Sequence, residues 1–204
     1  MDLTATLEKI SLDTDEVLNV FVYGSRVYGT NTLESDWDLL IIINNDSLFI
    51  PDQLLINNQD LTIISLQQIK IDISNNNIQR LELLWAPPPS ILINKINLLD
   101  FFVLDLNALR ISVATVSTKC LAYAKILWLR ENDIKKGKKN LFHCIRYVCF
   151  GIQIAINGMI TNYTEANQYF NQIFEDQSTE WKHYNDIYGK KAKDLYKYFL
   201  TLVK

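Results

Sequence analysis

The change of pattern around the three consecutive prolines at 87–89 most constrains how this chain can fold. Before them, apolar residues come in short runs that are typical of β-strands. After them, apolar residues recur at helical spacing almost to the end of the chain. Proline cannot continue a helix or a central strand, so the tripeptide separates the two patterns. A small sheet followed by helices is an α+β architecture.

The sequence predicts particular elements on each side of these prolines. Before them it predicts a helix over 3–10 and strands over 17–23, 37–43 and 61–64. After them it predicts helices over 91–102, 106–129, 138–156, 163–174 and 179–203. We therefore divide the chain into a core domain, residues 1–90, and a helical domain, residues 91–204.

Charge is distributed unevenly along the chain. Residues 1–110 contain 6 Lys and Arg against 15 Asp and Glu, a net charge of −9, while residues 111–204 contain 14 against 8, a net charge of +6. Acidic clusters attract cations and basic faces attract phosphates, so metal and nucleotide could bind between the two parts. Two solvated surfaces would give the same counts.

Other features disfavour several classes of protein. The first ten residues carry acids and no basic stretch, so we expect no signal peptide, and no apolar run has the length of a membrane span. Cys120, Cys144 and Cys149 include no Cys-x-x-Cys pair and the chain has two histidines, which disfavours a zinc site. We expect reduced thiols in a cytoplasmic protein that does not bind membranes.

The segment FVYGSRVYGTNTLESDWDLLIII, residues 21–43, carries the strongest functional pattern. Residues two apart in a strand point to the same face, so Asp36 and Asp38 project together with Cα atoms about 6.5–7 Å apart. Without a cation the two carboxylates would repel each other beside the apolar residues that follow. Magnesium prefers oxygen ligands and keeps substrate phosphates in its remaining positions, so the pair predicts a magnesium site.

The Gly-Ser pair of the same segment predicts a phosphate-binding loop. Gly24 has no side chain to block a close backbone approach, and Ser25 offers a hydroxyl at the start of a short helix. Arg26 or Thr30 adds donors, and Gly29 permits the turn toward the second strand. Each part alone is ordinary in a turn or at a strand end, whereas the combination at these spacings is rare.

Gly24-Ser25, a gap of ten residues, then Asp36-Trp37-Asp38 resembles the signature of the DNA polymerase beta-type nucleotidyltransferase superfamily. Within it, GSRVYGTNTLESDWDL is similar to bacterial and phage nucleotidyltransferases associated with RNA ligases. The similarity extends through DLTIISLQQIKIDISNNNIQRLELLWAPP and, more weakly, to NLFHCIRYVCFGIQIAINGMI. The resemblance implies a small mixed sheet with flanking helices, followed by a C-terminal helical lobe.

The resemblance also implies roles for these residues. Gly24 and Ser25 match the family's phosphate-binding pair, and Asp36 and Asp38 match its metal-binding carboxylates. Two Mg²⁺ ions would bridge the carboxylates and the triphosphate of ATP or another nucleoside triphosphate. One ion would activate the attacking hydroxyl and the other would stabilise the departing pyrophosphate.

A third carboxylate of the family comes from a neighbouring strand. Asp60, at the head of DLTIIS, is the preferred residue, both as a metal ligand and as the acceptor of the hydroxyl proton. Asp72 is the alternative, although its apolar neighbours also suit an exposed acid on a helix or strand. Glu82 matches a glutamate that recurs in the similar segment, while a salt bridge, with Arg80 as one partner, is an equally good interpretation.

A basic segment of the second half offers a phosphate-binding surface. Lys139, His143 and Arg146 fall at i, i+4 and i+7 on one face of a predicted helix. Lys135, Lys136 and Lys138 precede this face, at a helix end where cations are unfavourable. We take Lys139 and Arg146 as nucleotide-binding residues that contact triphosphate or RNA phosphates, with a solvated face as the alternative.

Taken together, these observations predict a metal-dependent nucleotidyltransferase. It would transfer a nucleoside monophosphate, AMP from ATP in the first instance, to a hydroxyl acceptor. The resemblance and the basic second half favour an RNA end. A protein hydroxyl, as in antitoxin-type members, and a small molecule such as an antibiotic are the alternatives, and a non-catalytic nucleotide- or RNA-binding module is the competing class.

Overall fold

The structure is a computed structural model that describes residues 3–44, 53–56 and 58–204. The chain forms two compact units. The sheet unit comprises Met1–Ser74 and Ala86–Phe102, and the helical unit comprises Asn75–Trp85 and Val103–Lys204. The expected α+β class, with a small mixed sheet, flanking helices and a C-terminal helical region, is confirmed. The predicted domain boundary between residues 90 and 91 stays a prediction.

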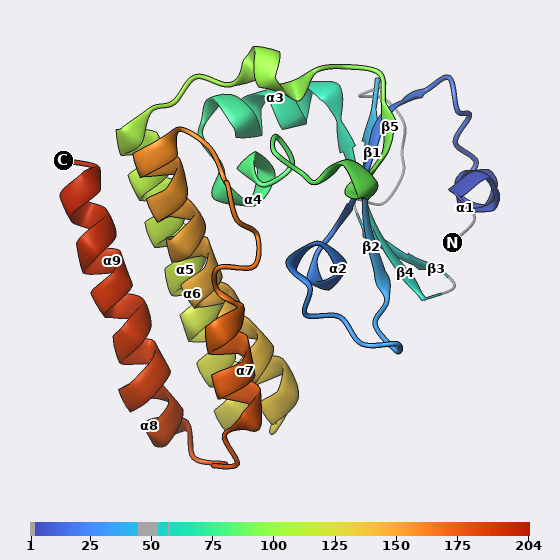
Figure 1. The fold of residues 1–204 in the computed structure, drawn as a ribbon. Coiled ribbons are helices and arrows are strands. Elements are labelled where there is room, and N and C mark those ends of the chain that lie inside the picture. Colours follow the sequence, from blue (N-terminus) through green and yellow to red (C-terminus); the bar gives the residue numbers. More distant parts are fainter. Residues whose placement is uncertain (1–2, 45–52, 57) are drawn as a thin grey trace. The chain divides into compact units, whose positions relative to one another are not determined.

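In the described residues, the sheet unit has five strands in the order β3-β4-β2-β1-β5 (Figure 1). The strands are β1 (Val17–Tyr23), β2 (Trp37–Ile43), β3 (Gln53–Ile56), β4 (Gln59–Ser65) and β5 (Ile91–Asn94). Strands β2 and β4 run parallel, and the other neighbouring pairs are antiparallel. The helical elements are α1 (Leu3–Lys9), α2 (Ser25–Tyr28), α3 (Leu66–Ser74) and the 3₁₀ turns Pro88–Ser90 and Leu98–Phe101.

The central strand β2 is buried on both of its faces. Ile41 and Ile43 pack with Leu7 of α1 in one apolar cluster. Leu40 and Ile42, which point to the opposite face, are also buried. A strand covered on both sides reads as one continuous apolar run, which is why the sequence predicted it with correct bounds. Only its first residues remain partly exposed, so its polar side chains gather at that end.

The predicted helix over 91–102 is wrong. Ile91–Asn94 is the edge strand β5, which pairs with β1, and a short 3₁₀ turn follows at Leu98–Phe101. Asn19 of β1 fixes this connection, because its amide donates to Asn94 Oδ1 and to the Ile96 carbonyl, both at 2.9 Å. The apolar spacing of ILIN suits a helix or a strand, and the unpaired edge of β1 decides between them.

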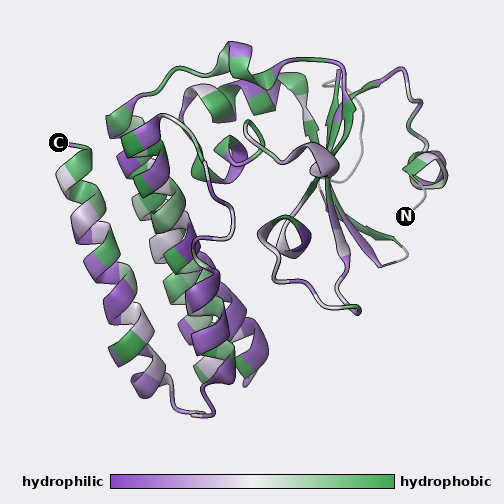
Figure 2. Cartoon of the chain, viewed as in Figure 1, coloured by the Kyte–Doolittle hydropathy of each residue, from purple (hydrophilic) through white to green (hydrophobic). Residues whose placement is uncertain are grey.

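The helical unit is built around one long, buried helix. Figure 1 shows α5 (Leu106–Leu129), α6 (Ile134–Asn157) and α9 (Lys190–Leu202) lying side by side. The shorter helices are α4 (Ile78–Leu81), α7 (Asn167–Glu175) and α8 (Trp181–Tyr184), and a π-helical turn at Asn185–Gly189 joins α8 to α9. Helix α6 is buried over most of its length, whereas α9 shows alternating hydrophobic and hydrophilic bands (Figure 2).

The long helices of this unit have well-defined ends. Asp105 and Asp133 accept backbone N–H bonds at the first turns of α5 and α6, and Gly158 ends α6 in the left-handed conformation with φ 73°. These caps fix the bounds of α5 where the sequence predicted them and begin α6 four residues earlier than predicted. In the described part of the chain, no helix combines the length and the apolar character that crossing a membrane requires.

Candidate active site

The register of three strands brings the predicted acidic residues to one edge of the sheet. Asp38 of β2 is the Cα partner of Tyr23 on β1 and of Asp60 on β4. Paired residues of neighbouring strands point to the same face, so Asp38 and Asp60 project side by side from strands about 4.8 Å apart. Asp36 lies two residues before Asp38, just outside β2. The register therefore brings Asp38 and Asp60 to one face and one end of the sheet.

Asp72 lies elsewhere in the sheet unit. It belongs to the helix α3, where its Oδ1 accepts a hydrogen bond from Gln68 Nε2 at 3.0 Å. It is therefore not on a strand that pairs with β2. The register favours Asp60 as the third carboxylate, and this assignment stays a prediction.

Gly24 is required where β1 passes into α2. Its backbone has φ 73° and ψ −151°, a region that residues with a Cβ atom rarely enter. A Cβ atom there would lie 2.0 Å from Oδ2 and 2.8 Å from Cγ of Asp38. The Asp38 carboxylate therefore occupies the space that a side chain at position 24 would fill. Glycine and aspartate of the sequence motif are in direct contact across the two strands.

Ser25 begins α2 directly after this contact. Its carbonyl accepts the N–H of Gly29, whose left-handed conformation with φ 71° ends the helix, and the N–H of Thr30 at 2.9 Å. The expected turn at Gly29 is confirmed. Ser25 thus stands at the first position of a one-turn helix beside Asp38, as a phosphate-binding role requires, and that role stays a prediction.

The donor set suits a magnesium ion, although the carboxylates are not gathered around one point. Among the described residues, no three His, Cys, Asp or Glu side chains form a group that could hold a metal ion. Both oxygens of Asp60 instead accept from Gln53 Nε2, each at 3.1 Å. Carboxylate oxygens are nevertheless the ligands that Mg²⁺ prefers, and Asp38 and Asp60 lie side by side in the register. Asp36, Asp38 and Asp60 are the residues that would hold it.

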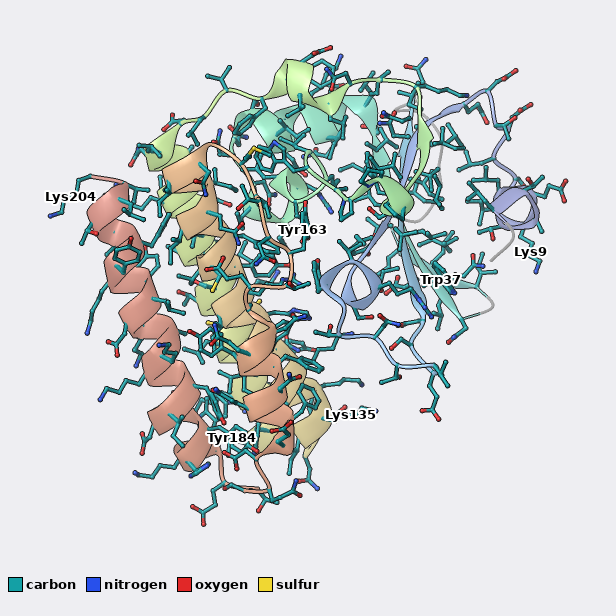
Figure 3. The ribbon with its side chains drawn as sticks, in the orientation of Figure 1. Lys9, Trp37, Lys135, Tyr163, Tyr184 and Lys204 are labelled. Atoms are coloured by element: carbon teal, nitrogen blue, oxygen red, sulfur yellow. The ribbon has the colours of Figure 1, made fainter. Side chains whose placement is uncertain are left out.

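Arg26 has partners that the sequence did not reveal. Its Nε donates to the Asp36 carbonyl at 3.0 Å and its Nη2 donates to the Ser35 carbonyl at 2.5 Å. The guanidinium carbon lies 4.1 Å from the centre of the Trp37 ring. Trp37 is the first residue of β2 (Figure 3). The side chain therefore holds the turn that leads into β2. Its expected contact with nucleotide phosphates stays a prediction.

The basic residues of α6 do not form one exposed face. Lys139 is exposed, whereas Arg146 is 2% exposed and lies with its Nη2 3.9 Å from Glu82 Oε2. Its guanidinium also faces the rings of Tyr147 and Phe150, with 4.6 and 5.6 Å to the ring centres. The segment carrying α4 packs against α6 at this level, two turns after Lys139. The prediction that the residues at i, i+4 and i+7 form one phosphate-binding surface is therefore wrong at Arg146, which is buried.

The neighbours of Arg146 complete a buried polar cluster in the helical unit. The Tyr163 hydroxyl donates to the Glu82 carbonyl. The His143 Nδ1 is buried and has no hydrogen-bond partner among the described residues. Burial, with Arg146 and Lys139 nearby, lowers the pKa of His143 well below its usual value. Of the two interpretations of Glu82, the structure shows the salt bridge, in which Arg146 is a partner.

Two contacts on the site face were not predicted. Gln53, the partner of Asp60, lies on β3, a four-residue strand whose sequence QLLI has no distinctive pattern. The Tyr23 hydroxyl lies 3.0 Å from Thr62 Oγ1. Since Tyr23 pairs with Asp38 and Thr62 follows Asp60 by two residues, this contact borders the carboxylates. This contact could be predicted from the sequence only if the register of β1, β2 and β4 were already known.

Part of the chain matches a known protein family. Residues 5–86 match the model of the family described as polymerase beta, nucleotidyltransferase. The chain is also similar to the crystal structure of the spectinomycin adenyltransferase AAD(9) from Enterococcus faecialis with ATP and spectinomycin. That similarity has 11% identity and a TM-score of 0.49, over 96% of this chain and 97% of the other. Curated protein sequences give no significant match.

The family match covers the elements that build the site, from α1 through the four strands β1 to β4 and on to α4. It includes the glycine against Asp38 and the aligned carboxylates of β2 and β4. Residues 5–86 therefore carry a nucleotidyltransferase domain of the polymerase beta type.

Proposed function

We propose that this nucleotidyltransferase transfers the nucleoside monophosphate of a nucleoside triphosphate, AMP from ATP in the first instance, to a hydroxyl group. The observation that carries the proposal is the register that sets Asp38 beside Asp60, with Asp38 against Gly24. Carboxylates on one face of adjacent strands, next to a glycine that leaves the backbone open to a ligand, suit a metal-bound triphosphate.

The residues of the site divide the chemistry between them. Gly24 and Ser25 bind the triphosphate, and Asp36, Asp38 and Asp60 hold the metal. The attacking oxygen forms a bond to the α-phosphorus, the bond from that phosphorus to the β-phosphate oxygen breaks, and pyrophosphate leaves. Asp60 accepts the proton of the attacking hydroxyl. When bound, Mg²⁺ neutralises charge on the phosphates and polarises the attacking hydroxyl.

We propose an RNA end as the acceptor. The similarity to nucleotidyltransferases associated with RNA ligases supports it, and so do the exposed Lys135, Lys136 and Lys139 at the start of α6. Arg146 no longer contributes to this argument because it is buried beside Glu82. The support from charge therefore rests on the first turns of α6 alone.

Labelling with two forms of each nucleoside triphosphate tests both the reaction and the acceptor. The protein is incubated with Mg²⁺ and RNA, a cell lysate or a pool of small molecules including aminocyclitol antibiotics. Label at the α-phosphate should enter the RNA, and label at the γ-phosphate should appear only in pyrophosphate. Asp38→Asn should abolish transfer, with Asp72→Asn as the matched control.

The outcomes separate the parts of the proposal. Transfer of the γ-label would indicate a kinase and reject nucleotidyl transfer. Transfer of the α-label to protein or to a small molecule would reject only the RNA acceptor. Full activity of the Asp38→Asn protein would reject the assigned site.

A further inference from the structure

The side chain of Arg26 joins the loop after β1 to the turn before β2. Its guanidinium contacts three consecutive residues among those the structure describes: the Ser35 carbonyl at 2.5 Å, the Asp36 carbonyl at 3.0 Å and the Trp37 ring at 4.1 Å. Ser35 closes the same turn, because its hydroxyl accepts the Thr32 N–H at 2.9 Å. Arg26 is thus the connection between the helix that starts at Ser25 and the backbone that carries Asp36.

The geometry of these contacts suits only an arginine. Two nitrogens of one planar guanidinium reach two successive carbonyls, and the same plane lies over an aromatic ring. Lysine has one charged nitrogen on a flexible chain, so it can keep the charge but cannot make this set of contacts. Hydrogen bonds from a charged donor are among the stronger ones in proteins, so the turn loses much of its support without them.

We propose that Arg26 is a positioning residue for the metal-binding carboxylates. It fixes the backbone of Ser35–Trp37 so that Asp36 enters β2 in line with Asp38, and it does so without contacting the nucleotide. The Trp37 ring belongs to the face opposite Asp38, since neighbouring residues of a strand alternate. Trp37 packs there against the apolar cluster of Val22, Leu39 and Leu61, which anchors the arrangement. This inference rests on the proposed metal-binding role of Asp36 and Asp38.

The two roles open to Arg26 make opposite predictions for one substitution. If Arg26 bound phosphates, Arg26→Lys would keep most of the nucleotide affinity, because a lysine ammonium is a competent phosphate ligand. If Arg26 positions the turn, Arg26→Lys should be as harmful as Arg26→Gln, because both lose the paired carbonyl contacts. The comparison of Lys with Gln at one position therefore separates charge from geometry.

The experiment measures three quantities on the full chain. These are the dissociation constant of Mn²⁺ without nucleotide, that of ATP in EDTA, and the hydrogen exchange of amides 30–37. We expect both Arg26 variants to weaken Mn²⁺ binding at least about tenfold, as is typical for outer-shell partners of metal ligands. ATP affinity in EDTA should stay within about twofold, and amides 30–37 should exchange faster. Arg110→Lys is the matched control, because Arg110 is exposed on α5 and bonds to Asn107.

Trp37→Leu keeps the inference testable if the Arg26 variants fold poorly, since it removes the ring under the guanidinium and leaves every carboxylate in place. It should weaken Mn²⁺ binding in the same direction. Unchanged Mn²⁺ binding in Arg26→Lys and Trp37→Leu overturns the inference, and so does a loss of ATP affinity in Arg26→Gln that Arg26→Lys restores. Asp38→Asn serves as the reference: if that protein still binds Mn²⁺ and transfers nucleotide, the proposed function itself fails.

Discussion

The sheet unit and the helical unit use their charged side chains in different ways. In the sheet unit, Asp36, Asp38 and Asp60 are half-buried, and the register sets Asp38 beside Asp60. In the helical unit, Arg146 and Glu82 are buried against each other, and the lysines at the start of α6 remain on the surface. The difference shows that charged residues are available for binding where the strand register aligns them at the surface. Where other elements pack over them, as over Arg146 and Glu82, they form a buried pair that contributes to the structure.

The largest expected effect tests the alignment in the sheet unit. Asp38→Asn should lower the rate of transfer by about a thousandfold or more, because it removes a charged ligand from the metal site. The melting temperature without metal should stay level or rise, since a repulsive charge is lost. Steady-state kinetics and calorimetry measure the two effects. Asp72→Asn should change neither, and a comparable loss of activity in Asp72→Asn would mean that the third carboxylate has been assigned to the wrong element.

The second expected effect tests the enclosed pair in the helical unit. Arg146→Met should reduce the free energy of unfolding of that unit by about 3–5 kcal/mol, because the buried Glu82 carboxylate loses the charged partner beside it. Urea unfolding followed by circular dichroism at the helical band measures it. Replacing both residues, Arg146→Met with Glu82→Leu, should recover much of the loss.

Lys139→Met provides the control on the exposed part of the same helix. It should change stability by less than about 0.5 kcal/mol, as surface substitutions usually do. If the Arg146→Met protein were stable and bound RNA more weakly, the contrast between the two units would be wrong, because Arg146 would then bind RNA and not stabilise the fold.

A smaller effect concerns the pH dependence of stability. Burial lowers the pKa of His143 well below its usual value, so the folded protein keeps this residue neutral while the unfolded chain takes up a proton below about pH 6.5. The free energy of unfolding should therefore fall as the pH drops below about 6.5, by up to about 1.4 kcal/mol per unit for this group, and this contribution should be constant above it. His143→Gln should reduce the slope.

The smallest expected effect concerns the exposed lysines. If Lys136 and Lys139 contact RNA phosphates, replacing both with Ala should flatten the slope of log affinity against log salt by up to about 0.7 per contact for a single strand. Fluorescence anisotropy with a labelled RNA over a salt series measures the slope. An unchanged slope would leave these lysines as a solvated face, and a protein or small-molecule acceptor would then become the better proposal.

Sequence patterns predicted that Asp38 lies at the start of a buried strand, because a continuous apolar run follows it. The period of two could not fix the side chain of Asp36, because that residue lies just outside β2. The strand bounds of β1 and β2 also followed from their apolar runs and from Gly24 between them. Asp60 could be named as the third carboxylate from the resemblance, and the parallel register supplies the physical reason, since it pairs Asp60 with Asp38.

Other parts of the fold depended on contacts between distant segments. ILIN at 91–94 has the spacing of either a helix or a strand, and the edge of β1 with Asn19 makes it a strand. Likewise, i, i+4 and i+7 place Lys139 and Arg146 on one side of α6, yet the segment around α4 covers that side only at Arg146. The spacing of residues predicts which of them share a face of a helix or strand. It does not predict which other segment packs against that face.

The sequence by itself therefore determined the α+β class, the Gly-Ser and Asp-x-Asp motif, and the resemblance to the superfamily, because these depend on local conformation and residue spacing. Tertiary structure alone decided three features: the pairing of Asp38 with Asp60, the contact of Gly24 with the Asp38 carboxylate, and the contacts of Arg26 with the turn before β2. Each of these depends on which backbone atoms approach one another across the sheet, and the strand register that sets those distances forms only when the chain is folded.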